Sequence, residues 1–443
     1  MGEEDPAFRQ VAHGALSPRA AAGLDVISGR NQGDPRAGES RDEPSDSAPE
    51  ASLSPQELSS IAALPDVPED LGKALRAAAE RDSPLAMLIL DARTNRLLGS
   101  LARHLDALRQ AAANDEDAPV LRISRDDIES CRQTWEGGVL AGEHRLYDFA
   151  TVVAQALTGS KNIQLVARVV MGQKEEEEAP GSTRIVIEEH ITRENLKKVT
   201  DYSLSQRIAR RYRYRASHDQ PFGVLYPRAS FLELWPLDPQ EEAPATRVLT
   251  RVKTNDQIWN KVCDALFGID ALVARDKILN SGSKYIKDVF GVKILTPRRA
   301  DSYRVDEILS VITWTQRQLL EVGLHPEPAL QRLEVLERKD YLSLPPEQKK
   351  RTGWEAIKNV YRWGGQVFEV QIQTEANYFL EALHLTDTSH RTFEMKRRQM
   401  RRELERVVPH YAEYRRLLKL LFRREDDEEL AALEESLPWL VIE

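Results

Sequence analysis

The stretch GGQVFEVQIQT, residues 364–374, indicates the fold, because two glycines followed by alternating side chains are typical of a tight turn leading into a β-strand. Successive side chains of a strand point to opposite faces. One face of this strand carries apolar side chains, those of Phe368, Val370 and Ile372. The other face carries a carboxylate and two amides, those of Glu369, Gln371 and Gln373. We expect this polar face either to meet water or to line a site.

The segments around this strand predict a mixed sheet. EAIKNVYRW, residues 355–363, reads as the first strand of a hairpin that turns at the two glycines, and VFGVKILT, residues 289–296, reads as a buried strand. One helix is expected over residues 303–323, and mostly helical sequence follows the hairpin. This order of elements is typical of an α+β fold, in which a mixed β-sheet is flanked by helices.

Composition divides the chain into segments of different character. The N-terminal segment is rich in Gly, Pro, Ser and acidic residues and poor in large apolar ones, which predicts disorder. Strands are expected from PVLRI, NIQLVARVVMG, STRIVIEEHI and VLYPRASFLELWPL, with no recognisable catalytic pattern among them. The predicted segments are a disordered N-terminus (1–52), a helical region (53–117), an α+β accessory module (118–247), a second α+β domain (250–423) and an acidic C-terminal tail (424–443).

The bulk composition excludes several classes of protein. The chain has 443 residues, of which 41% are hydrophobic and 30% charged, and its formal net charge of −9 argues against nucleic-acid binding through overall charge. Two cysteines, Cys131 and Cys263, are too few for a disulfide framework or a cysteine-rich zinc site, which favours a reducing, cytoplasmic compartment. No apolar run approaches the roughly 20 residues that span a bilayer, so no membrane partner is expected.

Two carboxylates and a basic stretch are the candidate site residues. Asp288 precedes the strand 289–296, and it would converge with Glu369 if the two strands are neighbours. Such a pair suits Mg²⁺, which prefers oxygen ligands and is typically held by one or two carboxylates together with substrate phosphates. Cations at short spacing upstream suit a triphosphate, unless they form a solvated helix face; they are Arg275, Lys277, Lys284 and Lys287.

The order of these motifs resembles the synthetase domain of the RelA/SpoT family. FEVQIQT is similar to the family's E-[IV]-Q-I-R-T, and DVFGVKIL is similar to its D-[IVL]-x-G-[IV]-R strand. DYLSLPPEQKKRTGWEAI is similar to D-Y-I-x-x-P-K-x-x-G-Y-x-S-[IL]-H. The resemblance covers residues 265–400. It implies a nucleotidyltransferase-like domain that makes the alarmones (p)ppGpp of the stringent response, by moving pyrophosphate from ATP to the 3′-hydroxyl of GDP or GTP.

The resemblance also implies roles for single residues. Asp288 and Glu369 would hold Mg²⁺, and Glu369 would also be the general base for the attacking hydroxyl. Trp354 stands where the family has a tyrosine that stacks on guanine, a role that an indole can fill. The other nucleotide-binding residues that it implies are Arg275, Lys277, Lys284, Lys358 and Gln371.

Two substitutions relative to the family pattern leave the acceptor open. Lys358 replaces a histidine, and Gln373 replaces an arginine. A guanine nucleotide is the first expectation. The alternatives are the 3′ end of a tRNA, as in toxin-like members, and a catalytically degenerate domain that binds a nucleotide or another protein.

Overall fold

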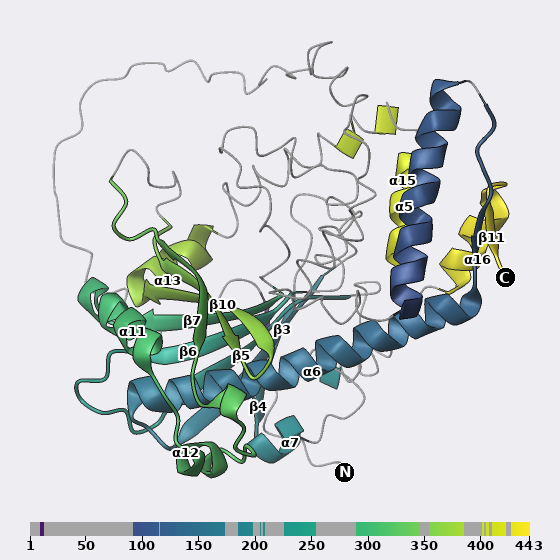
Figure 1. Cartoon of the computed structure of the whole chain (residues 1–443). Coiled ribbons are helices and arrows are strands. Elements are labelled where there is room, and N and C mark those ends of the chain that lie inside the picture. The colour runs from purple at the N-terminus through teal and green to yellow at the C-terminus, as the bar shows by residue number, and fades with distance from the viewer. Residues whose placement is uncertain are drawn as a thin grey trace, which may run out of the picture.

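The structure of the chain is a computed structural model (Figure 1). The residues that it describes are 9–12, 92–114, 116–172, 185–197, 204, 207–208, 226–253, 289–345, 354–384, 401–402, 405–406, 410–421 and 427–443. Most of the segment 1–52 and all of the stretch 254–288 lie outside the described residues.

The described residues build one mixed sheet of nine strands. These are β1 (Arg9–Ala12), β3 (Ile163–Gly172), β4 (Ile185–Ile191), β5 (Tyr226–Pro236), β6 (Arg247–Val252), β7 (Phe290–Thr296), β8 (Glu334–Asp340), β9 (Ile357–Trp363) and β10 (Gln366–Thr374). Their order in the sheet is β1-β4-β3-β5-β6-β7-β10-β9-β8. Strands β7 and β10 are parallel, and the other neighbouring pairs are antiparallel, which confirms the expected mixed sheet.

The sheet continues from the predicted accessory module into the segment that follows it. β6 pairs with β5 on one side and with β7 on the other, with Leu249 opposite both Glu233 and Lys293. The loop between β5 and β6 therefore joins two adjacent strands. The expected strands of the module are all present in the described residues, and β3 and β4 pair in antiparallel fashion.

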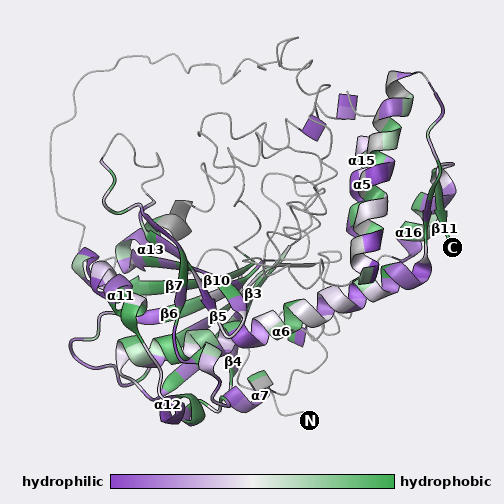
Figure 2. Cartoon of the chain, in the orientation of Figure 1, coloured by the Kyte–Doolittle hydropathy of each residue, from purple (hydrophilic) through white to green (hydrophobic). Residues whose placement is uncertain are grey.

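Two of the described helices cover the apolar face of this sheet. The described helices are α5 (Ala92–Ala113), α6 (Arg125–Thr158), α7 (Arg193–Lys197), α11 (Arg299–Val311), α12 (Gln316–Glu321), α13 (Glu375–His384), α15 (Tyr411–Leu420) and α16 (Asp427–Ser436). Phe149 of α6 stacks on Phe368 at 4.8 Å between ring centroids, and Asn359 of β9 donates to Asp306 of α11 at 2.7 Å. Thus α6 and α11 pack on the apolar face of β10, and the half of α6 beneath the sheet is mainly hydrophobic (Figure 2).

The 34-residue helix α6 is not among the elements predicted from the sequence. Ser124 caps its start by accepting from the backbone N–H of Asp126 at 3.2 Å, and Gly159 ends it with φ of +67°. Gly142 lets the helix approach the sheet, because a Cβ atom there would lie 2.1 Å from the ring of Phe290. The missing side chain at this position therefore sets the distance between α6 and β7.

The single helix predicted over 303–323 is wrong, because the chain breaks between α11 and α12. Thr315 starts α12 with a capping box, in which it and Gln318 exchange side-chain and backbone hydrogen bonds. Just before it, Trp314 packs edge-on against Trp363 of β9 at 5.9 Å. A cap and a buried indole together outweigh the helical periodicity. The end predicted at Gly323, which has φ of +73°, is confirmed.

Short strands near both ends of the described chain pair with other strands. The four residues of β1, within the segment 1–52, pair with the edge of β4, because an unpaired strand edge offers backbone partners to an extended segment. In the acidic C-terminal tail, β11 (Leu440–Ile442) pairs in parallel with β2 (Leu121–Ile123). Among the described helices, none combines the length and apolarity that crossing a membrane requires.

Candidate functional site

The parallel pair of β7 and β10 brings together the two strands that carry the site motifs. Glu369 lies opposite Gly291, and Gln371 lies opposite Lys293. The two strands are therefore neighbours, which is the condition under which the two carboxylates would converge. Asp288 lies three positions before Gly291, outside the described residues, as do Arg275, Lys277 and Lys284. Their roles stay predictions.

Glu369 is buried, so its part of the polar face of β10 is not open to water. The exposed fraction of its side chain is 10%. Gln371, two residues along the same strand, donates its Nε2–H to Oε1 at 2.7 Å. Lys358 on β9 places its Nζ 2.5 Å from Oε2. Both carboxylate oxygens thus have a partner, and three predicted site residues form one contact group.

The hairpin explains why these three residues meet. Gly364 and Gly365 have φ of +56° and +77°, the left-handed region that favours glycine in a two-residue turn. The turn pairs Trp363 with Gln366, and the register carries on to Lys358 opposite Gln371. On the other face Phe368, Val370 and Ile372 are fully buried, which fixes the register, since a slip by one residue would bury Glu369 among the helices.

Gly291 lies beside Glu369 and has no side chain. An added Cβ atom there would make ordinary van der Waals contacts, at 3.7 Å or more, with the backbone of Arg251 and Glu369 and with the Cβ atom of Arg251. Arg251 of β6 lies opposite Gly291 and so faces the same side as Glu369. A carboxylate and a guanidinium therefore flank a position without a side chain.

Trp354, the predicted stacking residue, lies just before β9. Its indole meets Tyr341 in a T-shaped contact, with 5.4 Å between ring centroids. The backbone N–H of Tyr341 donates to the carbonyl of Ala356 at 3.0 Å, which joins the end of β8 to the start of β9. Asn377 of α13 donates to the carbonyl of Glu355 at 3.4 Å. The aromatic pair and α13 are thus held at the same end of the hairpin.

A magnesium ion fits the described residues only in part. Within the described part of the chain, no three His, Cys, Asp or Glu side chains converge as a metal-binding group. Glu369 supplies one carboxylate, and a cation at its Oε2 would face the ammonium of Lys358 at short range. Magnesium binding at Glu369 would therefore require Asp288 as a second ligand and displacement of Lys358.

Sequence reasoning missed the cations of the neighbouring strands on the same face. Lys293 of β7 lies opposite Gln371, and its Nζ is 5.6 Å from the ring centroid of Tyr378 in α13. Arg247 and Arg251 of β6 also face this side, and Arg247 is nearly buried. The alternation of basic and apolar residues in FGVKIL and RVLTRV is the signal that predicts this placement.

Known proteins similar to this chain were found among solved structures. No family model matches the sequence, and no curated protein matches it significantly. Among solved structures, the chain is similar to small alarmone synthetase 1 from Bacillus subtilis bound to its product pppGpp, with 18% identity over 44% of this chain and 81% of that chain and a TM-score of 0.22. The form bound to AMPCPP gives 14% identity over 40% and 79%, with a TM-score of 0.19.

A second protein in this group is a GTP pyrophosphokinase family protein from Streptococcus pneumoniae, with 16% identity over 43% of this chain and 79% of that chain and a TM-score of 0.21. These are solved structures of the kind of enzyme that the sequence motifs indicate.

Proposed function

We propose that the chain transfers pyrophosphate from ATP to the 3′-hydroxyl of a guanine nucleotide. The observation that carries this proposal is Glu369, buried on the polar face of β10 directly beside the strand of the D-x-x-G-V-K motif. A carboxylate kept from bulk water, with cations on both neighbouring strands, suits phosphoryl-type transfer, in which positioning and charge neutralisation do most of the catalytic work.

In the proposed reaction Glu369 is the general base. The acceptor O3′ attacks the β-phosphorus of ATP, and a new O3′–Pβ bond forms. The bond from Pβ to the oxygen that bridges it to the α-phosphorus breaks, and AMP leaves with that oxygen. The hydroxyl proton passes to Glu369. An ionised carboxylate has about four lone-pair sites, so Glu369 can accept this proton at a site that the hydrogen bond from Gln371 leaves free. Magnesium held by Asp288 and Glu369 would supply charge neutralisation at the phosphates.

Transfer of a labelled phosphate tests the proposal. The purified chain is incubated with γ-labelled ATP and Mg²⁺ and offered GDP, GTP or deacylated tRNA as the acceptor. We expect label on GDP or GTP, and loss of transfer in Glu369→Gln, which keeps the shape of the side chain but not its basicity. Label on tRNA alone would move the assignment to the tRNA 3′ end. Transfer that survives Glu369→Gln would refute the assigned base.

A second candidate function is nucleotide binding without catalysis, and the ion pair of Lys358 with Glu369 favours it. An ammonium 2.5 Å from the carboxylate competes with a metal ion for the same oxygen. The variant Lys358→His introduces the residue that the resembling family has at this position. A wild-type chain that binds ATP without transferring label, together with transfer by Lys358→His, would establish a binding module derived from a synthetase.

A further inference from the structure

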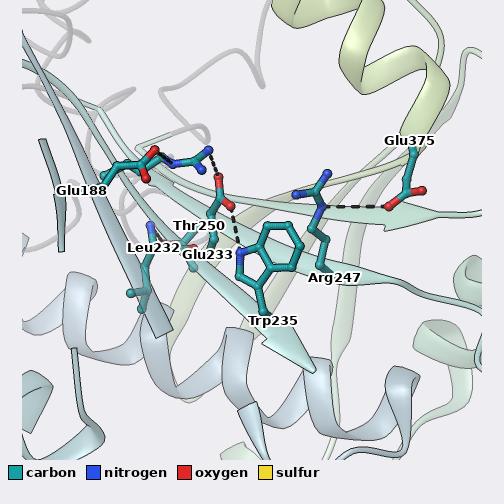
Figure 3. Close-up of polar contacts among 8 residues, drawn as sticks. Glu188, Leu232, Glu233, Trp235, Arg247, Thr250 and Glu375 are labelled. Carbon is teal, nitrogen blue, oxygen red and sulfur yellow. Dashed lines mark hydrogen bonds and ion pairs between the residues drawn. The ribbon is translucent and has the colours of Figure 1, made fainter. Parts of the chain in front are cut away.

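Arg247, the first residue of β6, is enclosed by aromatic rings. Its guanidinium carbon lies 4.4 Å from the ring centroid of Trp235, 5.7 Å from that of Tyr378 and 5.9 Å from that of Phe379. Its exposed fraction is 9%. Trp235 belongs to β5 (Figure 3). Tyr378 and Phe379 belong to α13, so this side chain of β6 contacts both a neighbouring strand and a helix that follows much later in the chain.

The same residue also contacts the first residue of α13. The Nε atom of Arg247 is 4.0 Å from Oε1 of Glu375, and the hydroxyl of Thr246 donates to that oxygen at 2.8 Å. Figure 3 shows Glu375 reaching from the start of α13 toward Arg247. A carboxylate in the first turn also suits the positive end of the helix dipole. The start of α13 is therefore fastened to β6 by charge, by a hydrogen bond and by ring contacts.

Helix α13 begins directly after β10, the strand of Glu369, and it lies on the same face of the sheet as Glu369. Its Tyr378 is near two cations from two strands, Arg247 of β6 and Lys293 of β7. Asn377, one residue earlier, reaches the carbonyl of Glu355 beside Trp354. The position of α13 thus determines the shape of the face on which the candidate site residues lie.

We propose that Arg247 is a positioning residue for nucleotide binding, acting by clamping α13 against β6. This inference rests on the proposed function. It extends that function to β5 and β6, which lie outside the segment 265–400 that resembles the synthetase family. The strands before the family-like segment are therefore part of the nucleotide-binding apparatus, because they hold the helix that follows the Glu369 strand.

Three variants of the full chain test the clamp. Arg247→Met keeps the aliphatic length and removes the charge and the stacking plane. Arg247→Lys keeps a charge for Glu375 but lacks the planar group that lies against Trp235. The matched control is Arg132→Met, because Arg132 is also a buried arginine but fastens α15, by donating to the carbonyls of Leu420 and Leu421 at 3.1 and 3.0 Å.

Two measurements are made on each variant, amide hydrogen exchange of α13 and α15 and the dissociation constants for ATP and for GDP. For Arg247→Met we expect faster exchange in α13 only, and nucleotide affinity lower by about tenfold, with Arg247→Lys between it and the wild type. For Arg132→Met we expect faster exchange in α15 and wild-type nucleotide affinity.

The outcomes separate the clamp from the proposed function. If the wild type binds neither ATP nor GDP, the proposed function fails, and the exchange of α13 still decides whether Arg247 clamps the helix. If the wild type binds nucleotide and Arg247→Met keeps both its affinity and the protection of α13, the clamp is refuted. Should Arg247→Met fail to fold, Arg247→Lys gives the same two readouts, and unchanged values in that variant would likewise overturn the inference.

Discussion

Two halves of the sheet bury charged side chains on the same face, and their arrangements differ. In the first half, formed by β3 to β6, Arg168 pairs with Glu188 and Glu233 at 2.7 Å each, and Trp235 donates to Glu233 at 3.0 Å. In the second half, formed by β7 to β10, Glu369 takes its partners from its own hairpin, and Gly291 lies on its other side.

The difference lies in what surrounds each carboxylate. The side chain of Glu233 is 2% exposed, and its partners lie on the adjacent strand and on its own strand. The side chain of Glu369 is 10% exposed, and the residue opposite it on β7 is Gly291, which has no side chain. Buried charges that are fully paired maintain structure, whereas a buried carboxylate beside a position without a side chain can take part in chemistry.

Replacing the two carboxylates by their amides tests this contrast with the largest expected effect. Glu369→Gln should lower the rate of phosphate transfer by about 10³-fold, because the amide cannot accept the hydroxyl proton. Glu233→Gln should instead lower the free energy of unfolding by about 2–4 kcal/mol, since it leaves Arg168 short of a buried partner. Label transfer and urea unfolding of both variants measure the two effects.

The wild-type chain and Glu188→Gln complete this comparison. Glu188 is more exposed than Glu233, at 32% of its side chain, so its amide variant should lose less stability. The contrast between the two halves breaks down if Glu233→Gln abolishes transfer at unchanged stability, or if Glu369→Gln changes stability alone.

Another buried carboxylate, Glu143 of α6, accepts a hydrogen bond from the hydroxyl of Tyr147, and the dependence of its charge on pH sharpens the comparison. Burial raises the pKa of Glu143 to about 7, against hydrogen bonds from the hydroxyl of Tyr147 and the backbone of Leu204 and the charge of Arg207, which lower it. The folded chain therefore holds a proton that the unfolded chain, with a pKa near 4.5, releases.

Because the folded state binds more protons between these two values, the free energy of unfolding falls as the pH rises from about 4.5 to about 7. The loss amounts to about 3 kcal/mol. Glu143→Gln should remove this slope, so the variant should equal the wild type near pH 4.5 and exceed it in stability near pH 8. Urea unfolding at several pH values measures both curves, and parallel curves would contradict the prediction.

The sequence predicted much of the second half of the sheet. Alternation along 366–374 placed Glu369 and Gln371 on one face, and two glycines placed the turn. The pairing of Lys358 with Gln371 could also be predicted from the sequence, because residues equally distant from a two-residue turn lie opposite each other. That pairing predicts the contact of Lys358 with Glu369, which the family-based roles did not.

Long-range packing explains what the sequence did not predict. The pairing of β6 with β7 joins strands far apart in the chain, and no local pattern encodes it. The break between α11 and α12 depends on the packing of Trp314 on Trp363, about fifty residues later. The contact of Arg247 with the start of α13 depends on where β6 lies in the sheet, and the strand order sets that place. Such contacts follow from the sheet topology, not from periodicity.

The turn of the β9–β10 hairpin offers the smallest expected effect and a matched pair of variants. At Gly365 an added Cβ atom meets nothing within 4 Å, so Gly365→Ala carries only the cost of a left-handed backbone, about 1 kcal/mol. At Gly364 the added atom would lie 2.6 Å from Leu330 and 3.1 Å from Arg145, so Gly364→Ala should cost about 2–3 kcal/mol. Urea unfolding of the two variants measures this difference.

The two variants also probe what holds Glu369 in its register. The buried side chains of Phe368, Val370 and Ile372 specify the register of β10 independently of the turn. Phosphate transfer per folded molecule should therefore survive both substitutions, while stability falls in the order Gly365→Ala, then Gly364→Ala. If transfer falls in step with stability, the turn, and not the apolar face, sets the contact between Lys358 and Glu369, and the second half of the sheet is less independent than its buried face indicates.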